Sequence, residues 1–431
     1  MGLEAILLLV CSFFLLLAIG VPIAYSVAIS AVLTMLVHMP ADIAFITMSQ
    51  RMATGLDSFA LIAIPFFILA GNIMNTGGIA KRLIDFAKVL VGMFPGGLAF
   101  VNIIACMLFG AISGSAVAAA SAIGGFMHPI LKKEGYDEGY AAAINISSAT
   151  TGMVIPPSNI LIVYSLASGG VSIGALFMAG YIPGILMGLA LMVVGGIFAV
   201  RKGYPSSPRP KLMEAVRSFL NALPSLFLLV VVIGGIIAGI FTATEASAIA
   251  VIYTLILGFL YRELSVIKLR DVILKSVNTT SIVAILIAAS MAMSWMLSYE
   301  NIPSVVSEIL LGISNNPIII LLIINATLLF VGVFMDMTPA VLVFTPIFLP
   351  VAIEIGIDPI HFGIMMVMNL CIGLCTPPVG SVLFVGCGVA NIDIQRVIRP
   401  LIPLFAVLVL VLLLVAFIPE LSLWLPRLVG Y

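Results

Sequence analysis

Long apolar runs alternate along the chain with short breaks that hold glycine, proline or charged residues. A helix needs about twenty apolar residues to cross a bilayer, and the pattern predicts ten full spans and two shorter hairpins. Eight of the spans are uninterrupted, and they cover residues 3–20, 23–37, 59–74, 176–200, 220–240, 246–260, 281–297 and 402–418. Residues 39–57 are mixed in polarity and are expected to form a connector.

The stretch 113–159 recurs in the second half of the chain at an offset of 221 positions, without gaps. The coincident positions carry residues that shape the backbone, namely Pro129 and Pro350, Gly135 and Gly356, Asp137 and Asp358, Gly152 and Gly373, and Pro156-Pro157 and Pro377-Pro378. Each copy is apolar but is interrupted twice. A doubled apolar segment with such breaks indicates the binding site of a secondary transporter.

Each interruption predicts a local structure. Residues 98–131 and 318–351 hold only about sixteen residues on each side of a break, so each is expected to form a re-entrant helical hairpin. The tips are Ser113-Gly114-Ser115 and Asp336-Met337-Thr338-Pro339, with Ser115 and Thr338 as helix N-caps and Pro339 at the first helical position. Residues 140–167 and 362–390 are long enough to span, but each is broken at its proline pair.

Charge placement predicts that the two copies have opposite orientations. With the N-terminus outside, 16 of the 18 lysines and arginines fall on the inner side, as the positive-inside rule requires. Lys132-Lys133 at the foot of the first hairpin corresponds to Ile353-Glu354 at the foot of the second. The expected organisation is therefore an inverted repeat of residues 1–214 and 215–431, with both termini outside. The amphipathic segments 77–92 and 302–313 are expected to lie along the interface.

Composition agrees with a polytopic all-α membrane protein. Hydrophobic residues make up 63% of the 431 positions, charged residues 8%, and the mean hydropathy is +1.31. The net charge is zero, which gives no reason to expect a nucleic acid partner. We find no buried Ser/His/Asp set, HExxH or Walker motif, so the chain is not expected to be an enzyme. His128 and His361 are expected near the membrane interface.

The four breaks are the candidate sites for chemistry, because non-helical backbone at membrane depth survives only where protein or a polar cavity satisfies it. Helix N-termini at the tips favour an anion such as a carboxylate. Freed carbonyls and hydroxyl oxygens suit Na⁺. Asp336 is the only acidic residue expected deep in the membrane, and it either binds a cation or merely caps its helix. Any single Ser or Thr is more often a packing residue.

At SGSAVA, IPPSN, MDMTP and CTPP the sequence resembles the large membrane subunit of tripartite ATP-independent periplasmic (TRAP) transporters of the ion-transporter superfamily. The resemblance extends over essentially the whole chain. It implies a multi-pass permease of the bacterial inner membrane, with periplasmic termini, driven by a Na⁺ gradient through an elevator mechanism. It also implies two protein partners, a small four-helix membrane subunit and a periplasmic substrate-binding protein.

The resemblance further implies a set of site residues, at least two bound Na⁺ ions and no organic cofactor. The implied Na⁺ ligands are Ser113, Gly114, Ser115, Asn145, Ser148, Thr151 and Gly152 in one site, and Gly332, Asp336, Thr338, Asn369, Gly373 and Thr376 in the other. The implied substrate contacts are Ser115, Pro156, Pro157, Ser158, Asn159, Thr338, Pro377 and Pro378. The expected substrate is an organic acid, either sialic acid (N-acetylneuraminate) or a C4-dicarboxylate. Two alternatives stay open: a stand-alone Na⁺/carboxylate symporter, and a channel or scaffold without transport.

Overall fold

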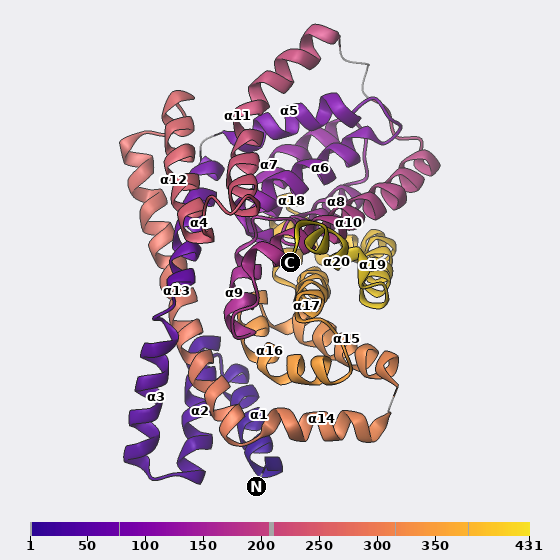
Figure 1. Ribbon diagram of the computed structural model, residues 1–431. Coiled ribbons are helices and arrows are strands. Elements are labelled where there is room, and N and C mark those ends of the chain that lie inside the picture. The colour runs from indigo at the N-terminus through magenta and orange to yellow at the C-terminus, as the bar shows by residue number, and fades with distance from the viewer. Residues whose placement is uncertain (1, 77, 207–210, 315, 378) are drawn as a thin grey trace.

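The computed structural model describes residues 2–76, 78–206, 211–314, 316–377 and 379–431, and every regular element in these ranges is a helix (Figure 1). Within the described residues, eight helices are long and apolar enough to cross a membrane. The predicted class, an all-α polytopic membrane protein, is confirmed.

One layer of the molecule is organised around a single long helix, α13 (Val266–Tyr299), on the left in Figure 1. Within this layer, three helices pack directly against it, namely α2 (Ile23–His38), α3 (Ala41–Gly55) and α4 (Ala63–Thr76). Helix α1 (Gly2–Ala18) packs against α2, and α12 (Ala243–Leu260) and the 3-10 turn η1 (Phe59–Ile62) pack against α4. We call this group the α13 layer.

The structure of the α13 layer differs from two predictions made from the sequence. Residues 39–57 were expected to form a connector, but α3 is a regular helix that packs against α13. The span predicted at 281–297 begins fifteen residues earlier, at Val266. Its first turns carry Lys268, Arg270 and Asp271, which lower the hydropathy but cost the helix little because they are exposed.

Two amphipathic helices lie at opposite ends of the view in Figure 1, α5 (Ile79–Val91) near the top and α14 (Ile302–Ile313) at the bottom. The buried residues of α5 recur at helical spacing, as expected of a helix with one apolar face. Arg82 ties α5 to the turn between α12 and α13, because its guanidinium lies 3.6 Å from the centre of the Tyr261 ring and 3.4 Å from a Glu263 carboxylate oxygen.

Both predicted hairpins are present. The first consists of α6 (Gly97–Ser113) and α7 (Ala116–Lys133), and the second of α15 (Pro317–Phe334) and α16 (Met337–Glu354). In each hairpin the two arms pack against one another.

Both predicted broken spans are present as well. The first consists of α8 (Glu138–Thr151) and α9 (Asn159–Ala167), and the second of α17 (Pro359–Gly373) and α18 (Ser381–Ala390). Three long helices complete the fold, α10 (Ile173–Lys202), α11 (Leu212–Ile237) and α19 (Ile394–Phe417). A short final helix, α20 (Glu420–Val429), was not predicted.

Helix α20 packs on the start of α17. His361, expected near the membrane interface, has a fully buried side chain there. Its Nδ1 lies 2.7 Å from the Ser422 hydroxyl on α20, and its Nε2 lies 3.3 Å from the Ala416 carbonyl oxygen on α19. His361 therefore fastens α17 to the end of the chain.

The two halves of the chain are interlocked. The first half of each broken span packs against the hairpin of its own half of the chain, α8 on α6 and α7, and α17 on α15 and α16. The second half of each broken span crosses over, so that α9 packs against α16 and α18 packs against α7. This exchange joins both hairpins and both broken spans into one body and brings the tips toward each other.

Tyr164 provides a test of this interlock. Its buried hydroxyl donates a hydrogen bond of 2.6 Å to the Pro359 carbonyl oxygen, joining α9 to the start of α17. We expect Tyr164→Phe to lower the free energy of unfolding by about 1 kcal/mol, measured as a lower melting temperature of the purified protein. Tyr299→Phe is the control, because the Tyr299 side chain is exposed. Equal melting temperatures for the two variants would argue against the bond.

Candidate functional site

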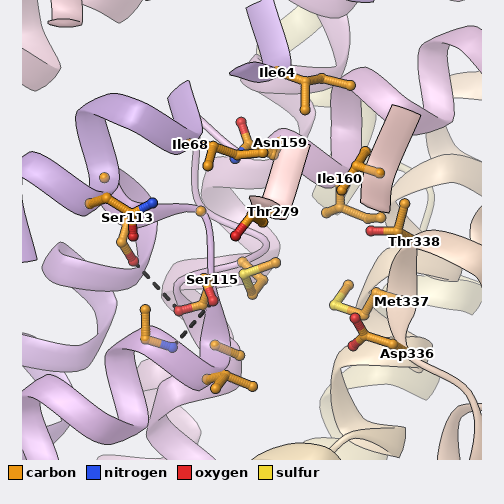
Figure 2. Close-up of a pocket in the computed structure, with 18 of the residues that line it drawn as sticks. Ile64, Ile68, Ser113, Ser115, Asn159, Ile160, Thr279, Asp336, Met337 and Thr338 are labelled. Atoms are coloured by element: carbon orange, nitrogen blue, oxygen red, sulfur yellow. Dashed lines mark hydrogen bonds between the residues drawn. The ribbon is translucent and has the colours of Figure 1, made fainter. Parts of the chain in front are cut away.

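The hairpin tips face a cavity of about 390 Å³ that is closed on its other side by α4 and α13. Figure 2 shows Ser113 and Ser115 of the first tip on one side of this cavity and Asp336 and Thr338 of the second tip on the other, with Thr279 between them. The volume falls within the range of small-molecule sites, about 300–1,000 Å³.

The first tip has the structure predicted from its sequence. Gly114 ends α6 in the left-handed conformation, with φ at +60°, which a residue without a side chain adopts at little cost. Ser115 is the N-cap of α7, and its hydroxyl accepts a hydrogen bond of 3.2 Å from the Ala118 amide. The start of α7 therefore points its unpaired backbone amides into the cavity, where they favour an anion.

The second tip differs from the prediction by two residues. Helix α16 begins at Met337 with Asp336 as its N-cap, whereas Thr338 had been predicted as the cap and Pro339 as the first helical residue. Asp336 therefore occupies the position that Ser115 holds in the first hairpin. Its side chain is exposed in the cavity, and it makes no capping hydrogen bond to α16.

A third helix begins at the cavity, after the break in the first broken span. Ser158 precedes α9, and its hydroxyl donates a hydrogen bond to the Met153 carbonyl oxygen across the break. Asn159, the first residue of α9, lines the cavity and lies beside Gly114, where an added Cβ would come within 2.8 Å of the Asn159 amide nitrogen. Three helix N-termini thus converge on one space.

Glycine pairs hold each hairpin against its broken span. An added Cβ on Gly152 would lie 2.5 Å from the Gly110 Cα, and one on Gly373 would lie 2.6 Å from the Gly332 Cα. At both glycines the neighbouring backbone is therefore too close for any side chain to fit. The equivalent arrangement in both halves places the end of α8 beside the first tip and the end of α17 beside the second.

In the first cluster of predicted cation ligands, the hydroxyls of Ser148 and Thr151 donate to backbone carbonyl oxygens of their own helix. Their oxygen lone pairs therefore face outward from these bonds and suit a cation. Asn145 does not line the central cavity. Its amide donates 2.8 Å to the Ala120 carbonyl oxygen of α7, and its oxygen faces the Cys106 thiol at 3.6 Å, so it fastens α8 to the hairpin away from the cavity.

In the second cluster Asn369 has a free acceptor. Its amide nitrogen donates to the carbonyl and side-chain oxygens of Asn325 on α15, at 2.8 and 2.9 Å. Its Oδ1 is buried and has no hydrogen-bond partner among the described residues. The Thr376 hydroxyl donates 2.9 Å to the Ile372 carbonyl oxygen. A buried oxygen without a donor, one turn before Gly373, is chemically suited to a cation.

The predicted substrate contacts fall into two groups. Ser115, Asn159 and Thr338 line the central cavity, whereas Ser158 and the prolines of the described chain do not. Pro156 lines a separate apolar crevice between α6, α10 and α11, and Pro157 is buried. Pro378 lies outside the described residues.

Sequence reasoning missed one wall of the cavity. Four polar residues line it from the α13 layer, namely Asn72 and Asn75 on α4, and Lys275 and Thr279 on α13. Asn72 and Asn75 are one turn apart in an otherwise apolar helix, a spacing that could have identified them as one polar face. Lys275 was assigned to a loop because the start of α13 was placed too late.

Comparisons with known proteins agree with this architecture. Residues 10–421 match the family described as tripartite ATP-independent periplasmic transporter, DctM component. The YdaH transporter of Alcanivorax borkumensis has a similar fold, with a TM-score of 0.64 over 86% of this chain and 87% of that one. Only 12% of the aligned residues are identical, so this likeness concerns the fold alone.

Three full-length relatives are similar in sequence. The chain is 56% identical over 423 residues to the uncharacterized protein YgiK of Salmonella typhimurium, covering 98% of this chain and 97% of that protein. It is 41% identical over 406 residues to the C4-dicarboxylate TRAP transporter large permease protein DctM of Pseudomonas aeruginosa, covering 94% of each. It is 39% identical over 414 residues to the sialic acid TRAP transporter large permease protein SiaM of Vibrio cholerae, covering 96% of each.

These matches span nearly the entire chain and join it to transport proteins rather than enzymes, as its sequence predicted. The chain belongs to the tripartite ATP-independent periplasmic transporter family, as a large permease component of the DctM type.

Proposed function

We propose that this protein is the large permease subunit of a Na⁺-coupled secondary transporter that imports an organic acid. The observation that carries this proposal is the meeting of two hairpin tips, one from each half of the chain, at one polar cavity. The acid is a C4-dicarboxylate or sialic acid, the substrates named for two of the relatives.

In this proposal the halves 1–214 and 215–431 have opposite orientations in the bacterial inner membrane, with both termini on the periplasmic side. The positions of α5 and α14 at opposite ends of the molecule support it (Figure 1). The body formed by the hairpins and broken spans moves as an elevator against the α13 layer, and α5 and α14 connect the two.

The proposed acid site uses the helix N-termini at Ser115, Asn159 and Asp336. The backbone amides there attract a carboxylate through their partial positive charge. The proposed Na⁺ sites lie behind the tips, one near Ser113, Ser148 and Thr151, and the other near Asp336, Asn369 and Thr376. Na⁺ is a co-transported substrate here, and at least two ions move with each acid. The free Oδ1 of Asn369 supports the second site most directly.

Two partners complete the proposed system. A small four-helix membrane subunit joins the permease, and a periplasmic binding protein delivers the acid. This proposal rests on family membership, since the large permease proteins DctM and SiaM are named as parts of TRAP transporters.

Ion-dependent uptake is the test of this function. We expect proteoliposomes that hold the permease and its small subunit to accumulate a labelled acid when the binding protein and an inward Na⁺ gradient are present. Uptake should fall by at least about tenfold when K⁺ replaces Na⁺, because the larger ion does not suit sites formed by close backbone packing. The dependence of the rate on Na⁺ concentration should be sigmoidal, as expected for two or more ions.

The same assay separates the alternatives. Equal uptake with and without the binding protein would identify a stand-alone symporter. Uptake that is indifferent to Na⁺, or absent for every acid in a panel of dicarboxylates and sialic acid, would contradict the proposed function.

A further inference from the structure

Lys275 occupies a cavity wall that the proposed function does not yet use. It lies nine residues after the start of α13, about 14 Å along the helix. Its side chain is exposed and lines the central cavity together with Thr279, one turn later on the same helix. Asp336 and Thr338 line the same cavity from the second tip.

The Lys275 ammonium has no ion-pair partner within 4.0 Å among the described residues. Asp336, the acidic residue that lines the same cavity, is beyond that distance. Placing an unpaired charge in a membrane-spanning helix is costly, at least about 2.5 kcal/mol at the centre, and such residues mark substrate pathways. The Lys275 ammonium faces a water-accessible space, where it is free to bind an anion.

Polar residues next to Lys275 join α4 to α13 through hydrogen bonds. The Asn72 amide donates 2.9 Å to the Ser276 hydroxyl, which in turn donates 2.7 Å to the Val272 carbonyl oxygen. This chain of bonds holds α4 and α13 in register. The Asn75 amide and the Lys275 ammonium therefore share one wall, and both can donate to an anion. The Thr279 hydroxyl beside them already donates 3.1 Å to the Lys275 carbonyl oxygen.

We propose that Lys275 binds a second anionic group of the transported acid, while the helix N-termini at the tips bind the first. This inference rests on the proposed function. The cavity then has two anion-binding walls, one on the hairpins and one on the α13 layer, and it selects a dicarboxylate over a monocarboxylate of the same chain length. The monoanionic sialic acid is correspondingly disfavoured.

Direct binding to the permease tests this assignment without the selectivity of a binding protein. The full-length permease, purified with its small membrane subunit in Na⁺ buffer, is titrated with radiolabelled succinate in competition with butyrate. We expect Lys275→Met to raise the Kd for succinate about ten- to a hundredfold, the effect of losing a hydrogen bond to a charged group. Binding of butyrate should change by less than about threefold, and Lys275→Arg should retain tight succinate binding because it keeps the charge.

Lys268→Met is the matched control. Lys268 lies two turns earlier on α13, outside the cavity, where its Nζ donates 2.9 Å to the Glu263 carbonyl oxygen. Lys275→Gln replaces the methionine variant if the latter does not assemble with the small subunit. Equal succinate binding by the Lys275 and Lys268 variants would overturn the assignment, as would an equal loss for succinate and butyrate.

Ligand binding by the unmodified protein distinguishes a failure of this inference from a failure of the proposed function on which it rests. If it binds neither succinate nor sialic acid, the proposed function itself fails. If it binds sialic acid but not succinate, transport of an organic acid survives and the role of Lys275 is wrong.

Discussion

Asp336→Asn is expected to raise the Na⁺ concentration for half-maximal uptake by about tenfold or more, and to make the Na⁺ dependence less sigmoidal. Asn and Asp are equally good N-caps, so the start of α16 should persist while the negative charge is lost. Hydrogen bonds and ion contacts that involve a charged group contribute about 1.5–3 kcal/mol each, which corresponds to a tenfold or larger change in affinity. The measurement is the initial rate of acid uptake as a function of Na⁺ concentration.

Two features of the structure favour this outcome over a purely structural role for Asp336. Its carboxylate is exposed in the cavity, and it makes no capping hydrogen bond to α16. Glu308→Gln serves as the control, since it removes a carboxylate from the exposed face of α14. An unchanged Na⁺ dependence in Asp336→Asn would remove this residue from the cation site and leave it as a helix cap.

Gly373→Ala is expected to abolish most Na⁺-dependent uptake and to lower the melting temperature of the protein. A Cβ at this position would lie 2.6, 2.7 and 2.9 Å from the Cα, C and O atoms of Gly332. Because these are backbone atoms, no flexible side chain can move aside, and α15 must shift away from α17. Overpacking of this kind costs about 1–3 kcal/mol, and it displaces the second tip from Asn369 and Thr376.

Gly388→Ala is the matched control, because Gly388 is a helical glycine of α18 with open space where the Cβ would be. Alanine is favoured over glycine within a helix by about 1 kcal/mol, so this variant should be slightly stabilised and active. Gly152→Ala, the equivalent change in the first half, should behave like Gly373→Ala. Normal uptake by both disruptive variants would show that the close contacts are not needed for the cation sites.

The sequence was most informative where the backbone has to change direction. The first hairpin tip and both span breaks lie where glycine, proline and the internal repeat predicted them, the second helix of the other hairpin begins two residues early, and α14 has the predicted bounds. These signals are local. A proline or an N-cap residue acts on its own turn of helix, so its effect can be read without knowledge of the neighbouring helices.

Predictions failed where an element is stabilised by its neighbours. Helix α3 and the first turns of α13 are too polar to be recognised by hydropathy, but α2, α3 and α4 pack along α13 and make it one long helix. The hydrogen bond between His361 and Ser422 of α20 joins residues 61 positions apart in sequence. Asn325 was not predicted because its role is to pair with Asn369 across two helices.

The residues of the candidate site also divide into those that a local sequence signal predicted and those that only tertiary packing brings in. Ser115, Asp336 and Thr338 were predicted from the hairpin tips and Asn159 from the family resemblance, and all four line the cavity. Asn145 was implied by the family resemblance, and its amide nitrogen joins α8 to α7. Lys275 has no counterpart in any tip or break. It enters the site because α13 packs alongside α16 of the second hairpin, a tertiary contact that no local pattern reveals.

Protection of a cysteine at the second tip tests most directly whether the acid and Na⁺ are held between the hairpins. Cys11 is the exposed native cysteine, and the other four are buried, so Thr338→Cys can be placed in a Cys11→Ser background. Na⁺ and the acid, with the acid at about ten times its own Kd, should slow the alkylation of the cysteine at position 338 by about tenfold. The alkylation rate of the control variant, Glu308→Cys, should stay unchanged. Equal alkylation rates with and without both ligands would contradict a binding site between the two tips.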